Sequence, residues 1–486
     1  MLPAGASRRE VPPLTLHAQL TQEIRTGPSG PKIAAFFDLD QTLLAGFSAS
    51  AFFRERLMSG RMGPRELGEA IAGALSFSLG RTGFSGLMSA TTAAYRGLAE
   101  SAMQQVGQEV FEKHLATSIY PESRALVRAH QEMGHTVAIV SSATRYQADP
   151  LARDMGIEHV LCTHLEVVDG AFTGRVVRPT CYGEGKAEAA RGLALQHDLE
   201  LSQGYFYTDS HEDLPLLDIV GQPRPLNPDA RLAQVAKERG WPVRRFHSRG
   251  RPSVGDLVRT GLALWTALPS LGAGLAAGLV SGSRREGVNL AGSIWGDLAT
   301  SLAGIDLRVE GEEHLWSQRP AVFIFNHQSG IDALLMIKLL RRDVTGVGKK
   351  ELRRIPIFGT AFSLGGVVFI DRADTGKAIE ALKPAVEALR HGQSLAIAPE
   401  GTRSPTPRLG RFKKGAFHIA MQAGVPIVPI VFRNALDALP KGGLVVRPAT
   451  VEAVVLPPVD TSQWQRENLD AEIAAIRSRV LDVLEG

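Results

Sequence analysis

Short apolar runs alternate with helical patterns through the first half of the chain. Uninterrupted apolar runs at 33–37, 136–140 and 205–208 are typical of strands covered on both faces of a parallel sheet. Helical periodicity at 121–132 and 186–196 separates these runs. Strands that alternate with helices indicate an open α/β fold, so we predict a Rossmann-like parallel sheet.

The segments around this sheet are less regular. Residues 45–115 lie between the first two predicted strands and carry helical patterning over a length that exceeds a simple crossover, so we expect a helical cap. Residues 1–31 are rich in Pro, Gly and Ser apart from a helical stretch near 14–24, and we interpret them as a tail. Pro-rich, charged sequence at 241–252 predicts that this first domain covers 32–250.

An apolar segment over 251–305 follows. Residues 260–283 contain no charged side chain, and the segment is long enough to cross a bilayer. Pro269 and several glycines interrupt its helical pattern. A second apolar stretch spans 288–302. Two short apolar helices favour in-plane membrane docking, and a buried helical hairpin of a soluble domain is the alternative.

A second α/β pattern covers 306–486, so the predicted fold class is α/β with two domains and an apolar helical segment between them. A final helix is expected over about 471–484. The predicted strands are the apolar runs Ala321–Phe325, Gly366–Ile370, Leu395–Ala398 and Val428–Phe432.

Composition narrows the class of protein. The length of 486 residues exceeds one ordinary core, and 44% apolar with 21% charged residues is typical of a folded globular protein. The formal charge of +4 is weak evidence for any partner. Because the chain has no arginine-rich block and no zinc-ligand spacing, we expect no nucleic-acid partner. Cys162 and Cys181 form no disulfide framework, so a reducing compartment is expected, and the first residues predict no cleaved signal peptide.

Two aspartates follow the first predicted strand. In open α/β sheets the chemistry lies at the carboxyl ends of strands, where Asp38 and Asp40 are expected. One carboxylate can attack phosphorus while the other serves as general acid and base, and a divalent ion would offset the negative charge. A turn or helix-capping pair is the alternative.

Later strand ends supply matching groups. Ser141 can donate to a phosphate oxygen, and Lys186 can neutralise a transferring phosphoryl group. Asp209 and Asp213 follow the strand at 205–208 and can complete a Mg²⁺ site.

With these four groups in order, residues 32–246 resemble the haloacid dehalogenase superfamily, in the branch that includes phosphoserine phosphatases. The resemblance implies that Asp38 is the nucleophile and Asp40 the acid/base. It also implies phosphate contacts from Ser141 and Lys186, and Mg²⁺ held by Asp38, Asp40 and Asp209 with support from Asp213. Phosphoserine phosphatases carry a glutamate where this chain has Phe47, so we do not expect phosphoserine as substrate and leave the substrate open.

A histidine and an aspartate follow a strand of the second domain. His327 can remove a proton from a hydroxyl, and Asp332 can fix the histidine tautomer. The same spacing recurs at His164 and Asp169, but Asp169-Gly170 predicts a hairpin turn there.

Two later blocks deliver arginines after strands. Arg372 ends one block, and Glu400, Gly401 and Arg403 belong to the other. Paired arginines suit recognition of a phosphate monoester, although Arg372 could be a surface ion-pair partner. The nearby lysines, Lys349, Lys350, Lys413 and Lys414, are most simply solvated surface charges, and a basic rim near a phosphate is the alternative.

Together these blocks resemble the glycerophospholipid acyltransferase family, especially lysophosphatidic acid acyltransferases, over about residues 285–460. The resemblance implies His327 as general base, Asp332 as its orienting partner, and an acceptor region from Arg372, Glu400, Gly401 and Arg403. It implies a lysophospholipid acceptor and an acyl thioester donor on CoA or acyl carrier protein.

The combined expectation is an acyltransferase that makes phosphatidic acid, fused to a Mg²⁺-dependent phosphomonoesterase. The protein would dock in monotopic fashion at an anionic membrane surface on the cytoplasmic face. Two alternatives stay open for the first domain: it could be a phosphometabolite sensor or scaffold without turnover, or it could dephosphorylate the lipid to give diacylglycerol. The sequence leaves the oligomeric state open.

Overall fold

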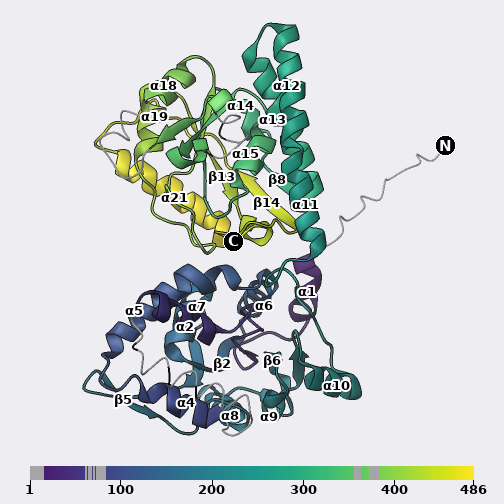
Figure 1. Cartoon of the computed structure of the whole chain (residues 1–486), viewed down its shortest axis with the longest axis vertical. Helices are drawn as coiled ribbons and strands as arrows, with labels where there is room; N and C mark the ends of the chain where they lie inside the picture. Colours follow the sequence, from purple (N-terminus) through teal and green to yellow (C-terminus); the bar gives the residue numbers. More distant parts are fainter. Residues whose placement is uncertain are drawn as a thin grey trace, which may run out of the picture. The chain divides into compact units, whose positions relative to one another are not determined.

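The computed structural model describes residues 16–60, 63, 68, 72, 84–354, 359, 363–370 and 383–485. The chain forms two compact units, Met1–Gly250 and Arg251–Gly486. Each contains its own sheet and its own buried clusters, so each is described by itself (Figure 1).

The first unit is built on a five-stranded parallel sheet in the order β3-β2-β1-β6-β7. The three predicted strands are its centre, and all four residues of β1 and β6 are buried, which explains their uninterrupted apolar sequence. The strands are β1 (Ala34–Phe37), β2 (Thr136–Thr144), β3 (His159–Thr163), β6 (Tyr205–Thr208) and β7 (Gln222–Pro225).

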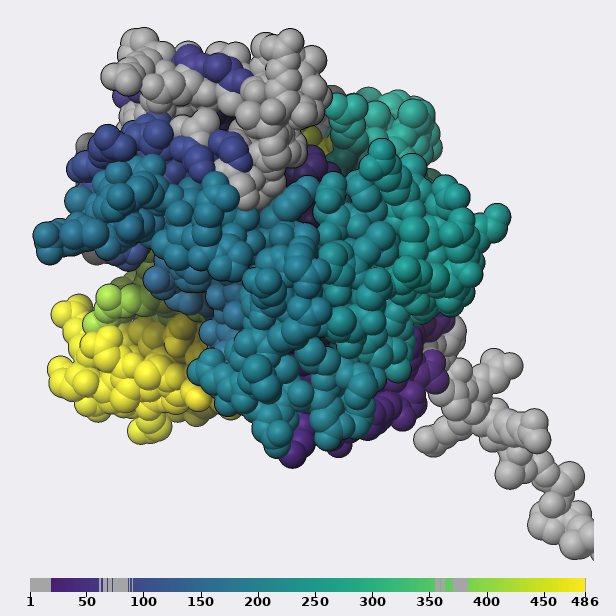
Figure 2. All heavy atoms as spheres, turned by 90° about the horizontal axis from the view of Figure 1, so that it is seen from below, coloured from purple at the N-terminus to yellow at the C-terminus, as the bar shows by residue number. Residues whose placement is uncertain are grey.

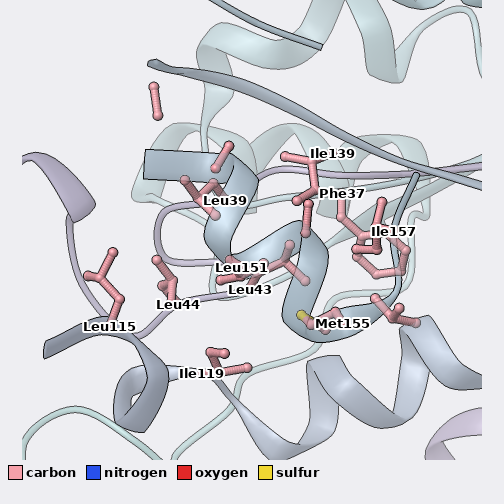
Figure 3. Packing of buried hydrophobic residues seen from close by; sticks show 14 of the residues in the cluster. Phe37, Leu39, Leu43, Leu44, Leu115, Ile119, Ile139, Leu151, Met155 and Ile157 are labelled. Atoms are coloured by element: carbon pink, nitrogen blue, oxygen red, sulfur yellow. The ribbon is translucent and has the colours of Figure 1, made fainter. Parts of the chain in front are cut away.

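Helices cover both faces of this sheet. One face packs on a cluster that includes α1, α6 and α7, and Figure 3 shows the side chains of Phe37, Leu39 and Leu43 within it. The other face packs on α8, α9 and α10. The helices are α1 (Leu16–Arg25), α6 (Pro121–Glu132), α7 (Arg145–Met155), α8 (Glu184–His197), α9 (Leu214–Leu217) and α10 (Ala230–Arg239), with short 3-10 turns at Leu201–Gln203 and His211–Asp213.

The insert between β1 and β2 is helical where it is described. It contains α2 (Ser48–Met58), α4 (Phe84–Ala93), α5 (Glu100–Val110), a π turn at Phe111–Leu115 and a 3-10 turn at Ala116–Ser118. The hairpin β4 (Leu165–Val168) and β5 (Ala171–Val176) contacts α4. Its turn residues Asp169 and Gly170 have φ of 50° and 75°, as the Asp-Gly sequence predicts.

Residues 1–31 were expected to be a tail, and this is wrong for α1, which packs on the first unit. Leu20 and Ile24 of α1 are buried in the same cluster as β1, and α1 packs against α6. Glu23 also pairs with Arg224 of β7. The purple atoms near the start of the described chain accordingly lie among teal atoms of the same unit (Figure 2). Two buried apolar side chains, Leu20 and Ile24, were too weak a signal next to a segment rich in Pro and Gly.

The second unit has a seven-stranded sheet in the order β11-β10-β12-β9-β13-β14-β8. Its strands are parallel apart from the antiparallel β13–β14 pair, and β8 runs parallel to β14. The strands are β8 (Ile305–Glu310), β9 (Val322–Phe325), β10 (Val344–Lys349), β11 (Val368–Ile370), β12 (Ser394–Ile397), β13 (Ile427–Phe432) and β14 (Ala449–Val455).

Helices again lie on both faces. The cluster on one face includes α13, α15 and α20, and the cluster on the other includes α18, α19 and α21. The helices are α11 (Val254–Trp265), α12 (Ala267–Ser281), α13 (Arg284–Ala303), α14 (His314–Ser317), α15 (Asp332–Leu340), α18 (Lys383–Arg390), α19 (Gly415–Ala423), α20 (Ala435–Ala438) and α21 (Leu469–Glu485), with a 3-10 turn at Lys350–Arg354.

The apolar segment forms three helices, of which α12 and α13 lie side by side (Figure 1). Glycines permit their close approach, because a β-carbon built at Gly274 would lie 2.4 Å from the carbonyl oxygen of Gly287. Among the described residues, one helical stretch, Val254–Ser281, has the length and apolar composition needed to cross a membrane. Many of its large side chains are exposed, including Trp265 at 63% and Val280 at 90%.

Candidate active sites

In the first unit, charged groups meet at the carboxyl ends of β1 and β6. Asp38 follows β1 directly, and its Oδ1 lies 3.1 Å from Lys186 Nζ at the start of α8. The same ammonium lies 2.7 Å from Asp213 Oδ2, which also accepts a 2.5 Å hydrogen bond from Thr208 Oγ1. Lys186 is 3% exposed, so this cluster holds one buried cation between two buried carboxylates.

Asp40 is held by the first helix of the insert. Ser48, the first residue of α2, donates its backbone N–H to Asp40 Oδ1 at 2.8 Å, and its Oγ lies 3.2 Å from Asp40 Oδ2. Gln147 Nε2 lies 3.2 Å from the same Ser48 Oγ, and Gln147 Oε1 accepts the Thr144 backbone N–H at 2.8 Å. The nucleophile loop, the insert and the end of β2 are therefore joined by one hydrogen-bonded chain.

Burial makes the ionised carboxylates of this site unfavourable. Burial raises the pKa of Asp38 to about 6, with Lys186 opposing the shift and Asp213 adding to it. Burial and the charge of Asp38 raise the pKa of Asp209 to about 8, and burial raises that of Asp40 to about 7. A cation bound near these carboxylates would stabilise their charged forms and lower their raised pKa values.

The donor set suits Mg²⁺ in its chemistry. Among the described residues, no group of three or more His, Cys, Asp or Glu side chains is arranged to hold a metal ion by itself. Mg²⁺ does not require such a cage, because it keeps several waters and is usually bound by one or two carboxylates together with substrate phosphate. Asp38 and Asp209 meet that requirement, whereas the Asp40 side chain is turned toward Ser48.

The two remaining predicted residues lie near the nucleophile loop. Ser141 is buried within β2, and its Oγ accepts the backbone N–H of Ala143 at 3.2 Å. Phe47 precedes Ser48, which bonds Asp40, and is 61% exposed. An apolar side chain therefore stands beside the predicted acid/base.

In the second unit, the loop after β9 brings His327 and Asp332 together. His327 Nδ1 lies 2.8 Å from Asp332 Oδ2, and the same oxygen accepts the backbone N–H groups of Gln328 and Ser329, each at 2.9 Å. Because a carboxylate only accepts, the proton of the neutral ring is on Nδ1, which leaves the Nε2 lone pair free to take a proton. Asp332 is fully buried, and burial raises its pKa while these donors oppose the shift.

The Glu400–Arg403 turn braces the same loop. Glu400 Oε1 accepts the backbone N–H of His327 at 2.7 Å, and its Oε2 accepts that of Gly410 at 2.7 Å. A β-carbon at Gly410 would lie 2.6 Å from that Oε2, so a larger residue here would displace the Glu400 carboxylate. Gly401 has φ +73°, and Arg403 Nη1 would lie 3.3 Å from a β-carbon built at Gly330. The turn thus places Arg403 beside the start of the helix that carries Asp332.

The structure assembles most of the predicted acceptor region. Glu400, Gly401 and Arg403 lie together next to His327, whereas Arg372 lies outside the described residues. Ser48, Gln147 and Gly410 were not predicted as site residues, because each contacts a partner that is distant in sequence and none belongs to a recognisable motif. Gly410 follows the Glu400 block, but its sequence position alone does not show that its N–H bonds Glu400.

A cavity of about 940 Å³ lies behind this site. It is lined mostly by apolar side chains and backbone of α12, α13, α15 and β10. Phe325 and Ala396 line it from the sheet, and the Phe325 ring lies 5.9 Å from that of His327. The histidine therefore stands close to a large apolar volume, which the sequence did not predict.

Comparisons with known proteins match each unit separately. Residues 35–218 match the family model of haloacid dehalogenase-like hydrolases. The phosphoserine phosphatase SerB1 of Mycobacterium tuberculosis is 34% identical over 257 residues, covering 52% of this chain and 82% of that protein. The inhibition of morphological differentiation protein of Streptomyces azureus is 32% identical over 271 residues, covering 54% of this chain and 96% of that protein.

Residues 306–433 match the acyltransferase family model. The 1-acyl-sn-glycerol-3-phosphate acyltransferase of Limnanthes alba is 38% identical over 189 residues, covering 39% of this chain and 66% of that enzyme. The chain thus spans just under two thirds of that plant relative. Among solved structures, the 1-acyl-sn-glycerophosphate acyltransferase PlsC of Thermotoga maritima is 26% identical, covers 48% of this chain and 96% of that chain, and has a TM-score of 0.42.

Proposed function

Because the chain belongs to the haloacid dehalogenase-like hydrolases and carries an acyltransferase domain in residues 306–433, we propose that it is a bifunctional enzyme. The second unit acylates lysophosphatidic acid to phosphatidic acid, and the first hydrolyses a phosphomonoester. The observation that supports the acyltransferase activity is the 2.8 Å contact between His327 Nδ1 and Oδ2 of the buried Asp332.

In this mechanism His327 is the general base. Its Nε2 takes the proton of the acceptor hydroxyl as the oxygen attacks the thioester carbonyl, the C–O bond forms, and the C–S bond breaks to release the thiol. Asp332 stabilises the imidazolium that forms, because its Oδ2 faces Nδ1. Glu400 keeps the His327 backbone in place and is not a proton carrier, since backbone N–H groups occupy both of its oxygens.

The cavity beside Phe325 would hold the acyl chain. Its volume of about 940 Å³ and apolar lining suit a long hydrocarbon chain, and Phe325, which lines it, has its ring 5.9 Å from that of His327. Arg403 and Arg372 would bind the acceptor phosphate, and the donor would be an acyl thioester on CoA or acyl carrier protein.

Product analysis tests this activity. Incubation of the purified protein in phospholipid vesicles with oleoyl-CoA and lysophosphatidic acid should release free CoA and give phosphatidic acid in equal amounts. A wild-type protein that binds vesicles yet forms no phosphatidic acid with either donor carrier would contradict the proposal.

In the first unit, Asp38 would attack phosphorus while Asp40 protonates the leaving oxygen and later removes a proton from water. Mg²⁺ would be held by Asp38 and Asp209 with support from Asp213, and by the predicted third ligand Asp40 only if its side chain left Ser48; when bound, it would neutralise charge on the phosphoryl group. Lys186 and Ser141 would contact the phosphoryl oxygens. Lys186 is held ready for this by Asp38 and Asp213, which raise its pKa against the opposing effect of burial.

Asp38→Asn tests turnover in this unit. A panel of phosphomonoesters, including phosphoserine and phosphatidic acid, should show Mg²⁺-dependent phosphate release that the variant lacks. Equal rates for variant and wild type on every substrate would instead favour the sensor or scaffold alternative. Phosphate release from phosphatidic acid would favour diacylglycerol as the final product.

The exposed apolar side chains of α11 and α12 support membrane docking of the second unit. Trp265 and Val280 are largely exposed, and the substrates are amphipathic. We place the enzyme at an anionic membrane surface on the cytoplasmic face, docked in monotopic fashion. Flotation with vesicles should recover the protein with lipid, and Leu279→Asp with Val280→Asp should release it.

A further inference from the structure

Lys413 stands at the acceptor site without a partner in the described part of the chain. No ion pair joins its ammonium to any described carboxylate, although it is only thirteen residues from Glu400 in sequence. From sequence it is most simply a solvated charge. Its position beside the Glu400–Arg403 turn favours the alternative of a basic rim near a phosphate.

The side chain of Lys413 lies on Gly401. A β-carbon built at Gly401 would lie 3.0 Å from Lys413 Nζ, 3.1 Å from Cε and 3.2 Å from Cδ. The backbone N–H of Lys413 donates to the carbonyl of Pro399 at 2.8 Å, which fixes the stem next to the same turn. The absence of a side chain at Gly401 thus leaves the space in which the ammonium sits.

Its neighbour Lys414 behaves differently. Lys414 Nζ lies 2.7 Å from Asp470 Oδ1 of α21, so its charge is paired at the surface. The two lysines are adjacent and both exposed, yet only one of them rests on the turn that contacts His327. The pair provides a matched comparison.

The turn presents two cations that an anion could bridge. Glu400 is the one described carboxylate there, and its two oxygens are occupied by the N–H groups of His327 and Gly410. Arg403 likewise has no ion pair among the described residues. A phosphate monoester carries about −1.5 to −2 charge at neutral pH and has three acceptor oxygens, so it can accept from an ammonium as well as from the guanidinium of Arg403.

We propose that Lys413 binds the phosphate of the acceptor together with Arg403, and that Gly401 is glycine so that the ammonium can reach this position. The inference rests on the proposed acyl transfer to lysophosphatidic acid. It assigns Lys413 to recognition of the acceptor phosphate and not to the proton transfer.

The experiment compares Lys413→Ala with Lys414→Ala in vesicles, using lysophosphatidic acid and the phosphate-free acceptor monoacylglycerol. A charged hydrogen bond to phosphate predicts a KM for lysophosphatidic acid about 10- to 100-fold higher in Lys413→Ala, with kcat nearly unchanged. The slower reaction with monoacylglycerol should be the same as in wild type. Lys413→Arg should restore much of the affinity, and Lys414→Ala should match wild type.

Each outcome decides the assignment. A KM in Lys413→Ala equal to that of Lys414→Ala would overturn it, as would an equal loss with both acceptors, which would indicate a structural role. A wild-type protein that acylates lysophosphatidic acid while Lys413→Ala is unaffected removes only this inference. A wild type inactive on lysophosphatidic acid overturns the proposed function and this inference together.

Discussion

One oxygen of Asp332 organises the acyl-transfer loop. Oδ2 accepts from His327, Gln328 and Ser329, while Oδ1 is buried and has no hydrogen-bond partner in the described structure. An asparagine could therefore place its oxygen at the Oδ2 position and its NH₂ group at the Oδ1 position. The loop and the histidine tautomer would survive, and only the negative charge would be lost.

We accordingly expect Asp332→Asn to fold normally and to lose about 10²- to 10⁴-fold in kcat, because the imidazolium would lack its counter-charge. Asp332→Ala should add a loss of stability, since it leaves two backbone N–H groups unpaired. Thermal unfolding and steady-state kinetics on both variants measure this. Equal stability losses in the two variants would contradict the account.

A buried pair of histidines makes the first unit sensitive to pH. His130 Nδ1 lies 2.8 Å from His135 Nδ1, His130 Nε2 lies 2.9 Å from Tyr207 Oη, and His135 Nε2 lies 2.9 Å from the Pro28 carbonyl. The carbonyl only accepts, so His135 carries its proton on Nε2 and His130 donates from Nδ1. Burial, then His135 and Arg224, hold the pKa of His130 well below its usual 6.5.

This depressed pKa predicts the sign of the pH dependence. Above pH 6.5 both folded and unfolded His130 are neutral, and stability is full; below it the unfolded chain binds a proton that the folded unit excludes. Stability should fall by up to about 1.4 kcal/mol per pH unit below 6.5. Urea unfolding followed by hydrogen exchange in β6 measures this, and His130→Gln should flatten the slope while His197→Gln retains it. A slope unchanged in His130→Gln would show that another group titrates.

Residues whose partners lie at strand ends were predictable from the sequence. Asp38, Lys186 and Asp213 meet as expected, and so do His327 and Asp332, because a strand followed by a polar group places that group at a known edge. Partners that meet across the fold were not predictable. Lys413 is an example, since its side chain lies over Gly401, twelve residues away in sequence.

At the scale of elements, glycine spacing sets the contact between α12 and α13. A β-carbon at Gly274 would lie 2.4 Å from the Gly287 oxygen and 2.6 Å from Ala291 Cβ, whereas one at Gly272 would meet no atom within 4 Å. The two glycines lie on the same helix, two residues apart. Alanine substitutions at the two positions therefore separate the effect of helix propensity from the effect of packing.

Gly274→Ala should therefore destabilise the second unit by about 1–3 kcal/mol through overpacking. Gly272→Ala should be neutral or stabilising by up to about 1 kcal/mol, because alanine favours the helix. Chemical denaturation in detergent measures both variants. Similar effects at the two positions would mean that α12 and α13 do not pack this closely.

Central strands were predictable, and several outer strands were not. The strands β9 and β13 are buried and carry uninterrupted apolar sequence. The strands β8 and β10 mix buried and partly exposed positions, and β7 contains two prolines, so none of them shows an apolar run. Two short apolar helices were expected in the apolar segment, and it forms three. The last of them, α13, joins the rest of its unit through ion pairs from Asp297 to Lys338 and Arg341.

At the scale of the whole molecule, the two sites belong to separate units with separate sheets and clusters. Their chemistry could be connected, because one unit would make a lipid phosphate and the other would cleave a phosphomonoester. The contacts described for each site come from residues of its own unit. Substitutions in one unit should therefore leave the catalytic rate of the other unchanged.

The most direct measurement is free-CoA release by His327→Ala at saturating oleoyl-CoA and lysophosphatidic acid. We expect a loss of at least about 10³-fold in kcat with vesicle binding and phosphatase activity retained. His418→Ala, which changes a histidine on α19 outside the site, should retain the wild-type rate. A folded His327→Ala protein that makes phosphatidic acid at a rate near that of wild type would contradict the assignment of His327 as the base.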